Sequence, residues 1–200
     1  MSKRGWLVER AGVWACVAVA MAVPAAQAQT REQIDWCYKG AQFPADRVIE
    51  GCTAVIEAGR ISGKDLATPY YVRCEIYRRR KRDYQQALRD CDAAIRLDPR
   101  NAKAFNNRGI VYRDLRDWDR ALADLNEAIP LDPKFSFAFN NRGNVYLDTK
   151  DYDRAIADFS TAIRLDRRYA NAFYNRGLAY EAKGDAARAR ADFSQAVKLR

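Results

Sequence analysis

Three stretches of the chain repeat one pattern at intervals of 34 residues: FNNRGIVY at 105–112, FNNRGNVY at 139–146 and FYNRGLAY at 173–180. The second half of each copy repeats at the same interval, with Ala121 and Leu125 in the first copy. Apolar positions three and four residues apart are typical of helices that bury one stripe. Each copy is therefore predicted to be a pair of helices that meet closely at their small residues.

Polar residues mark the expected helix ends. Pro99 and Pro133 each follow an aspartate after a second helix, and proline disfavours helix in the residue before it. Arg167 takes the place of this proline in one copy, so we expect a less sharply broken junction there. An aspartate at the turn inside each copy can cap the second helix by accepting backbone N–H bonds. These aspartates are Asp117, Asp151 and Asp185.

The period and the recurring aromatic, glycine, tyrosine and alanine positions resemble the tetratricopeptide repeat. The resemblance implies an all-α fold, a right-handed superhelical array of antiparallel helix pairs that forms a solenoid. The implied units are a degenerate hairpin at 29–67, a divergent repeat at 68–101, and repeats at 102–135, 136–169 and 170–200, the last of which lacks a capping helix.

The divergent copy matches the pattern only in part. Glu75 stands 34 residues before Gly109, and Arg78 stands 34 residues before Tyr112, so its first helix is expected to pack differently. Upstream, residues 37–59 resemble one more hairpin. The whole run is similar to small exported bacterial proteins that join a cysteine-bearing hairpin to tetratricopeptide repeats.

Residues 1–28 have the features of a signal peptide. A basic start precedes an apolar run over 11–23, and small residues follow it, which predicts cleavage between Ala28 and Gln29. The run is shorter than the roughly 20 residues of a spanning helix, although an uncleaved anchor is the alternative. We expect a periplasmic or secreted protein with no stable membrane insertion after cleavage.

Export would place the cysteines in an oxidising compartment, where thiols form cross-links. Loss of Cys16 with the signal leaves four cysteines, which allow three pairings. The repeat register favours a bond across each hairpin, and loops of that size are worth about 3 kcal/mol each. Bonds between successive hairpins are the alternative. The favoured pairs are Cys37 with Cys52 and Cys74 with Cys91.

An arginine three residues after the aromatic recurs 16 residues before an aspartate. On antiparallel helices these side chains can face each other, and we interpret them as an ion pair that fixes helix register. In the divergent copy, Cys74 replaces the arginine. The pairs are Arg108 with Asp124, Arg142 with Asp158, and Arg176 with Asp192.

Composition argues against catalysis. The chain has no histidine, which is the commonest general base and metal ligand, and no nucleotide-binding or nucleophile motif. We expect no enzyme, no metal and no cofactor. The net charge of +9 comes mostly from basic residues that alternate with acidic ones, so nucleic acid is not an expected partner. The exception is the basic run at 78–82, which leaves an anionic-surface binder as a third possibility.

The predicted binding surface is the concave face of the first helices. Asn107, Asn141 and Asn175 occupy the position at which repeats of this family carry a concave asparagine, whose amide suits the backbone of an extended peptide. We expect these amides to be solvated when no ligand is bound. Asp114 and Asp148 stand where carboxylate-capturing relatives place a basic residue, so that activity is not implied. The predicted face is Lys103, Asn106, Asn107, Ile110, Arg113, Phe137, Asn140, Asn141, Asn144, Asn171, Tyr174 and Asn175.

These observations predict an interaction scaffold that binds a protein or peptide of unidentified kind along its concave face. The alternative is a self-assembling module. It rests on an expected apolar face of the last repeat around Ala189, Phe193 and Val197, which would support a homo-oligomer.

Overall fold

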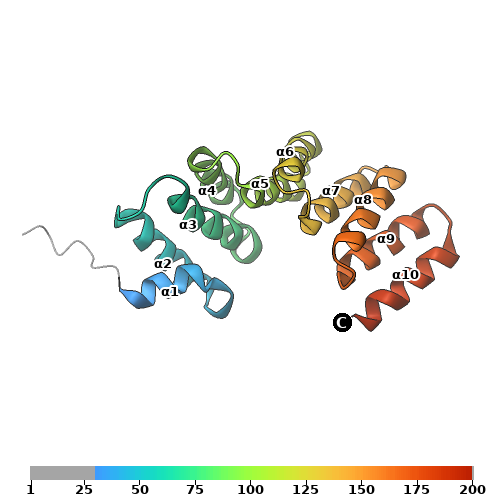
Figure 1. Cartoon of the computed structure of the whole chain (residues 1–200), viewed down its shortest axis with the longest axis horizontal. Coiled ribbons are helices and arrows are strands. Elements are labelled where there is room, and N and C mark those ends of the chain that lie inside the picture. The colour runs from blue at the N-terminus through green and yellow to red at the C-terminus, as the bar shows by residue number, and fades with distance from the viewer. Residues whose placement is uncertain (1–29, 200) are drawn as a thin grey trace, which may run out of the picture.

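The computed structural model describes residues 30–199, and every regular element in this range is helical. The predicted all-α solenoid is confirmed, because consecutive helices pack as neighbouring pairs along a curved array (Figure 1). No helix in this range is long and apolar enough to cross a membrane. The signal segment, Cys16 and the Ala28–Gln29 cleavage bond lie outside the described residues.

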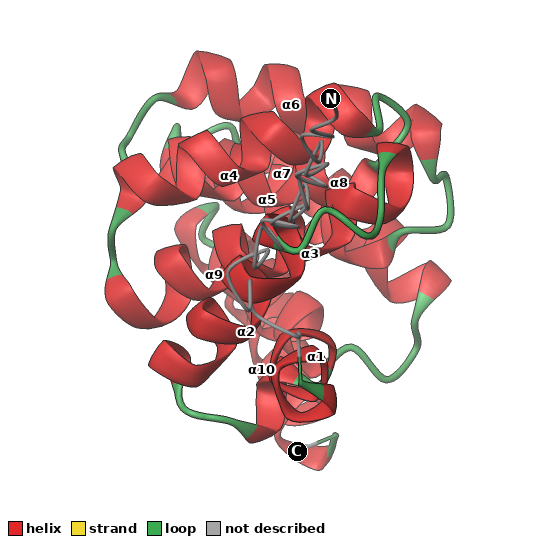
Figure 2. Ribbon diagram, turned by 90° about the vertical axis from the view of Figure 1, so that its left-hand side faces the viewer, coloured by secondary structure: helices red, strands yellow, loops and turns green. Residues whose placement is uncertain are grey.

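Packing is most extensive within five pairs of helices, and it is weaker between one pair and the next. A 3-10 turn, η1 (Gly40–Gln42), joins the first pair, and a π-helical turn, η2 (Tyr77–Lys81), extends α3. Figure 2, which looks along the array, shows the helices joined by short loops. The pairs are α1 (Arg31–Tyr38) with α2 (Ala45–Glu57), α3 (Gly63–Ile76) with α4 (Tyr84–Leu97), α5 (Ala102–Asp114) with α6 (Trp118–Leu131), α7 (Ser136–Asp148) with α8 (Tyr152–Leu165), and α9 (Ala170–Ala182) with α10 (Ala186–Lys198).

A glycine sits where the two helices of a repeat approach most closely. A Cβ atom added at Gly143 would lie 2.7 Å from the ring of Phe159, which is completely buried on α8. At Gly109 the added atom would lie 3.0 Å from Cγ of Leu125. Because glycine has no side chain, it leaves room at this crossing for the large side chain of the second helix.

Disulfides take the same place in the first two pairs. Cys37 is bonded to Cys52 with an S–S distance of 2.10 Å, and Cys74 is bonded to Cys91 at 2.11 Å. Each bond joins the two helices of one pair, and all four side chains are buried. The apolar contact that the later repeats make at this crossing is therefore replaced by a covalent one.

Aspartate side chains define the turns inside and between the pairs. Inside the pairs, the predicted caps are present, as Asp117 accepts the backbone N–H of Arg120 at 3.1 Å. Asp151 and Asp185 cap their helices in the same way. Between pairs, α8 ends as sharply as the helices before a proline.

The expectation that Arg167 would soften this junction is wrong. Asp166 accepts the backbone N–H of Arg168 at 2.9 Å, as Asp132 accepts that of Lys134 in the preceding junction. The aspartate, which offers the backbone an alternative to helix, therefore ends α8 without the proline.

The divergent pair keeps the packing of the others by shifting its register by one residue. Arg73, Cys74 and Tyr77 lie 35 residues before Arg108, Gly109 and Tyr112. The backbone absorbs the extra residue in η2, because Asp83 donates its N–H to the carbonyl of Tyr77, six residues back. In the next repeat the equivalent bond, from Asp117 to Tyr112, spans five.

Two expectations for this pair are therefore corrected. Glu75 and Arg78 do not occupy the glycine and tyrosine positions, because the π-helical turn moves Cys74 and Tyr77 into them. Cys74 does not replace the arginine either, since Arg73 supplies that side chain. Nε and Nη2 of Arg73 donate to Asp90 at 2.7 and 2.6 Å.

Candidate functional site

A groove of about 590 Å³ runs across the first helices of four pairs, α3, α5, α7 and α9. Every residue of the predicted concave face except Arg113 and Tyr174 lines it. Arg113 turns away to donate to Asp148 at 2.6 Å, which pairs the ends of α5 and α7. The ring of Tyr174 packs against Phe193 on α10, with centroids 5.4 Å apart.

The asparagines of the groove form hydrogen bonds from one repeat to the next. Asn141 donates its Nδ2 to Asn106 at 2.8 Å, and Asn175 donates to Asn140 at 3.1 Å. Both acceptors are 4% exposed. The expectation that the predicted asparagines would be solvated is wrong, because Asn141 and Asn175 join neighbouring repeats as well as lining the groove, and Asn107 is buried.

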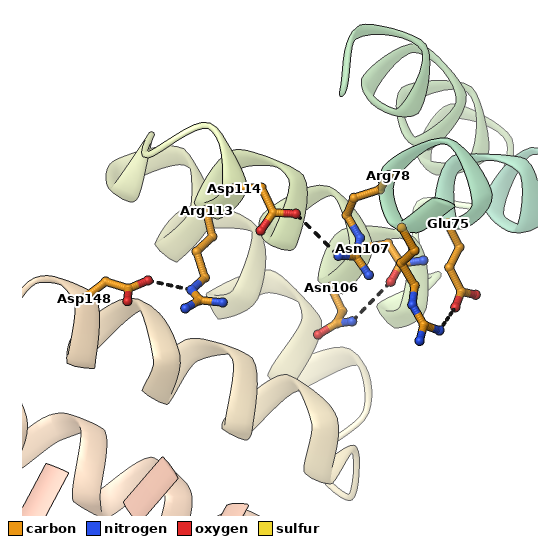
Figure 3. A network of polar contacts seen from close by, with 8 residues as sticks. Glu75, Arg78, Asn106, Asn107, Arg113, Asp114 and Asp148 are labelled. Atoms are coloured by element: carbon orange, nitrogen blue, oxygen red, sulfur yellow. Dashed lines mark hydrogen bonds and ion pairs between the residues drawn. The ribbon is translucent and has the colours of Figure 1, made fainter. Parts of the chain in front are cut away.

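Asn107 lacks the bond that its counterparts make. In each pair the acceptor lies 35 residues before the donor. Because the register of α3 is shifted by one residue, the equivalent position there is Tyr71, which lies 36 residues before Asn107 and 35 before Asn106. Nδ2 of Asn107 is buried with no hydrogen-bond partner, and the residue is 6% exposed. Its oxygen receives a long contact of 3.5 Å from Asn106 (Figure 3).

Six groove residues were missed by the sequence reasoning. Phe135 and Tyr169 lie 34 residues apart, just before α7 and α9, so their period was a usable signal. The missed residues on α3 and η2 could not be aligned with the later repeats, because the register of this segment is shifted. The missed residues are Tyr71, Glu75, Arg78, Arg79, Phe135 and Tyr169.

Aromatic rings cluster at the N-terminal ends of α7 and α9. The ring centroid of Phe137 lies 6.0 Å from that of Phe135 and 4.9 Å from that of Tyr169. Phe137 is 52% exposed, although it packs against both rings. Burial, and secondarily Asp166, raises the pKa of Tyr169 to about 12, so its hydroxyl is neutral at ordinary pH. The cluster offers an apolar surface inside an otherwise polar groove.

Cations exceed carboxylates in the groove. Its lining includes Arg78, Arg79 and Lys103 against the single carboxylate of Glu75, a net charge of +2. Arg79 is paired with Glu75 at 2.8 Å. Arg78 reaches Asp114, which lies outside the groove, only at 3.4 Å (Figure 3). No ion pair involves Lys103 among the described residues.

The rest of the basic run joins the first hairpin to the array. Arg80 donates to the backbone carbonyl of Phe43 at 2.6 Å, and Lys81 pairs with Asp46 at 2.5 Å. These contacts tie η2 to the first hairpin, so much of the run has a structural role.

The recurring arginine–aspartate pairs are present and lie outside the groove lining. Nε and Nη2 of Arg108 form a fork on Asp124 at 2.8 and 2.7 Å, and Nη1 reaches Asp92 of the preceding repeat at 2.7 Å. Hydrogen bonding to Asp124 raises the pKa of this guanidinium, which stays charged. The same fork joins Arg142 to Asp158 and Arg176 to Asp192.

The last pair is less apolar on its outer side than the sequence suggested. Ala189 is only 2% exposed, and Phe193 packs over Gly177 within the pair. Val197 alone of the three expected residues is largely exposed, at 71%. Position 190 carries an arginine, where Leu122 and Ile156 of the earlier repeats pack against their neighbours. The expected apolar face is therefore corrected to one exposed valine.

Comparison with known families supports the repeat assignment. Tetratricopeptide-repeat family models match residues 75–138, 125–157, 143–184 and 170–200, and together these matches extend from 75 to 200. The chain is a tetratricopeptide-repeat solenoid. No curated protein matches it significantly.

Solved structures share this solenoid at low sequence identity, so the likeness concerns the fold. MamA 41-end from Desulfovibrio magneticus RS-1 is 18% identical, with a TM-score of 0.69 over 88% of this chain and 95% of that one. BtubC from P. vanneervenii is 21% identical, with a TM-score of 0.67 over 81% and 75%. YrrB, described as a TPR protein with an unusual peptide-binding site, is 23% identical, with a TM-score of 0.60 over 84% of each chain.

Proposed function

We propose that this solenoid is a non-catalytic interaction scaffold that holds an extended segment of a partner protein in the groove. The observation that carries the proposal is the lining itself, where amides, aromatic rings and cations converge along four successive first helices. YrrB, which has the same fold, is described as having a peptide-binding site.

The chemistry of the lining suits a peptide. Side-chain amides both donate to and accept from a backbone, which offers one N–H and one C=O at nearly every residue. Phe137 supplies an exposed ring for an apolar side chain of the same segment. A groove over several repeats can hold a segment in an extended conformation, as concave solenoid surfaces do.

Peptide retention on the mature chain tests this function. A randomised library of nine-residue peptides, passed over immobilised residues 29–200, should leave a bound pool with recurring sequence features. Asn144→Trp fills the groove and should abolish retention. Glu127→Trp on α6, which is exposed and outside the groove, is the matched control and should retain the pool. Equal retention by both variants would place binding elsewhere.

We also propose that the mature protein works in the periplasm or outside the cell. The N-terminal segment with its small-residue cleavage pattern supports this location. Two buried disulfides, Cys37–Cys52 and Cys74–Cys91, are of a kind that persists in oxidising compartments. Fractionation of the producing cell and the mass of the isolated protein test it. A mature chain beginning at Gln29 with no titratable thiol is expected, whereas an unprocessed or reduced chain would contradict export.

Self-assembly through the last repeat has weaker support. Its outer side offers Val197 but presents Arg190 where the inner repeats carry an aliphatic contact. A cation at such a contact must lose its hydration when a second copy docks, which opposes the association.

A further inference from the structure

Two buried donors in the groove have no partner. They are Nδ2 of Asn107 and Nε of Arg78, and they are the only buried side-chain nitrogen or oxygen atoms of the described residues without a hydrogen bond. Both residues line the groove, on the neighbouring helix segments α5 and η2. Buried donors in native proteins are nearly always paired, so two orphans in one groove indicate a missing acceptor.

Each orphan has a local cause that leaves the atom without a hydrogen bond. Asn107 has no asparagine across from it, because α3 carries Tyr71 at that position. Arg78 uses Nη1 for a long contact to Asp114 and leaves Nε unused. Elsewhere in the chain, Nε and Nη2 of one arginine both donate to a carboxylate, as those of Arg142 do to Asp158 at 2.8 Å.

The surrounding charge selects the kind of acceptor. Glu75 is already engaged by Arg79, so Arg78 and Lys103 leave the groove with its net positive charge. A neutral carbonyl oxygen could accept from both donors, but it would bring no negative charge to offset that of the groove. A carboxylate has two oxygens and about four acceptor sites, so it can receive a guanidinium and an amide at once.

We propose that the groove binds an acidic side chain of the partner segment, with its carboxylate on Arg78 Nε and Asn107 Nδ2. This inference rests on the proposed peptide-binding function. The groove continues from these residues to Asn175 on α9, so a segment can run past the site and reach the aromatic cluster around Phe137. An Asp or Glu within the segment is therefore favoured over a terminal carboxylate, and an apolar residue follows it toward Phe137.

Two peptide libraries test the carboxylate directly. Both contain nine randomised residues except for a fixed fifth position, which is Glu in one and Gln in the other, and both are acetylated and amidated. We expect the mature protein to retain the Glu library about ten- to a hundred-fold more tightly, as a charge-assisted hydrogen bond contributes. Equal retention of both libraries would overturn this inference and leave the proposed function intact. Retention of neither would overturn the proposed function and the inference with it.

Matched variants assign the preference to the two donors. Arg78→Lys keeps the charge facing Asp114 but loses Nε, and it should remove most of the Glu-over-Gln preference. Arg113→Lys makes the same change in the Arg113–Asp148 pair outside the groove and should keep the preference for Glu over Gln. An unchanged preference in Arg78→Lys would contradict the assignment.

The amide donor is tested in the same way. Asn107→Ala should lose the preference for Glu over Gln, whereas Asn126→Ala on α6, which is exposed and outside the groove, should keep that preference. A free carboxyl terminus on the Gln library should not restore binding. If it does, the site takes a chain terminus and the side-chain assignment is wrong.

Discussion

At the scale of single residues, the glycine at the helix crossing of a repeat should be sensitive to added volume. In Gly143→Ala the new Cβ would lie 2.7 Å from a ring carbon of Phe159, which is locked in the core. Overpacking of this kind costs about 1–3 kcal/mol, and we expect a loss in that range from urea denaturation. Gly109→Ala meets Cγ of Leu125 at 3.0 Å and the backbone oxygen of Ala121 at 3.2 Å, and these longer contacts should cost less to accommodate. Equal losses in the two variants would contradict the packing described.

The groove asparagines should differ in what they contribute to folding. Asn141→Ala leaves the oxygen of Asn106 buried without its donor, which costs about 1–3 kcal/mol. Asn107→Ala removes an unpaired donor and should change the free energy of unfolding little, because only the long contact from Asn106 is lost. Chemical denaturation of both variants checks this, and similar losses would refute the distinction.

The sequence predicts which asparagines face the groove but not what they bind. Their positions follow from the 34-residue period, which places one face of every first helix on the same side. The bond from Asn141 to Asn106 depends on how two repeats pack, a relation that periodicity within one helix does not contain. The orphan at Asn107 is further from prediction, because it results from a tyrosine on a helix whose register was misassigned.

At the scale of elements, the turn inside each of the last four pairs contains a residue with left-handed backbone. Lys150 has φ 63° and Arg116 has φ 61°, whereas the last turn uses Gly184 at φ 81°. Left-handed conformation costs a non-glycine residue roughly 1–2 kcal/mol, partly offset by the entropy that glycine loses on folding. We expect Lys150→Gly to raise the free energy of unfolding by about 0.5–1 kcal/mol. Gly184→Lys, the reverse change, should lower it, and the same sign for both would contradict this cause.

The divergent pair shows where element prediction failed. A fixed period assumes that each turn contains the same number of residues, and η2 contains one more than its counterparts. The composition of 77–81 gives no sign of this, because arginines are compatible with either kind of helical turn. The packing partners reveal it: Cys74 must face Cys91, as Gly109 faces Leu125.

At the scale of the whole molecule, part of the acid sensitivity should come from the helix caps. Hydrogen bonds from the Arg120 side chain, and then from its backbone N–H, lower the pKa of Asp117, and Arg154 acts likewise on Asp151. For Asp185 the backbone bond from Arg188 is the larger cause. The pKa of each carboxyl is therefore lower in the folded state than in the unfolded chain, where it is near 3.8. The stabilisation from these caps is complete at pH values above the unfolded pKa, and it is lost as the pH falls through the folded pKa.

The melting temperature should therefore fall as pH decreases below about 4. Asparagine also caps helices but does not titrate, so replacing all three aspartates by Asn should make this fall shallower. Melting curves at pH 7 and pH 3 check the difference. An identical fall in the wild type and the triple variant would assign the acid sensitivity to other carboxylates.

The solenoid as a whole was predictable because one strongly periodic unit, repeated, leaves few ways to stack. Whether the outer face of a pair is apolar depends on single residues, which the 34-residue period does not determine. Leu88, Leu122 and Ile156 contact the next pair, and Arg190 occupies their position on α10. We expected an apolar outer face on the last pair because Phe193 and its neighbours are apolar. The last pair itself buries these side chains in part.

Arg190 should therefore keep the protein monomeric. In Arg190→Leu the outer side of α10 would present a leucine near Val197, and burial of one such side chain is worth about 1.5–3 kcal/mol in each copy. We expect wild-type residues 29–200 to scatter light as a monomer at all concentrations and the variant to form a dimer as concentration rises. Arg164→Leu, an exposed arginine on α8, controls for added hydrophobicity and should stay monomeric. A wild-type dimer would instead favour self-assembly through this repeat, because it would show that the arginine does not prevent docking.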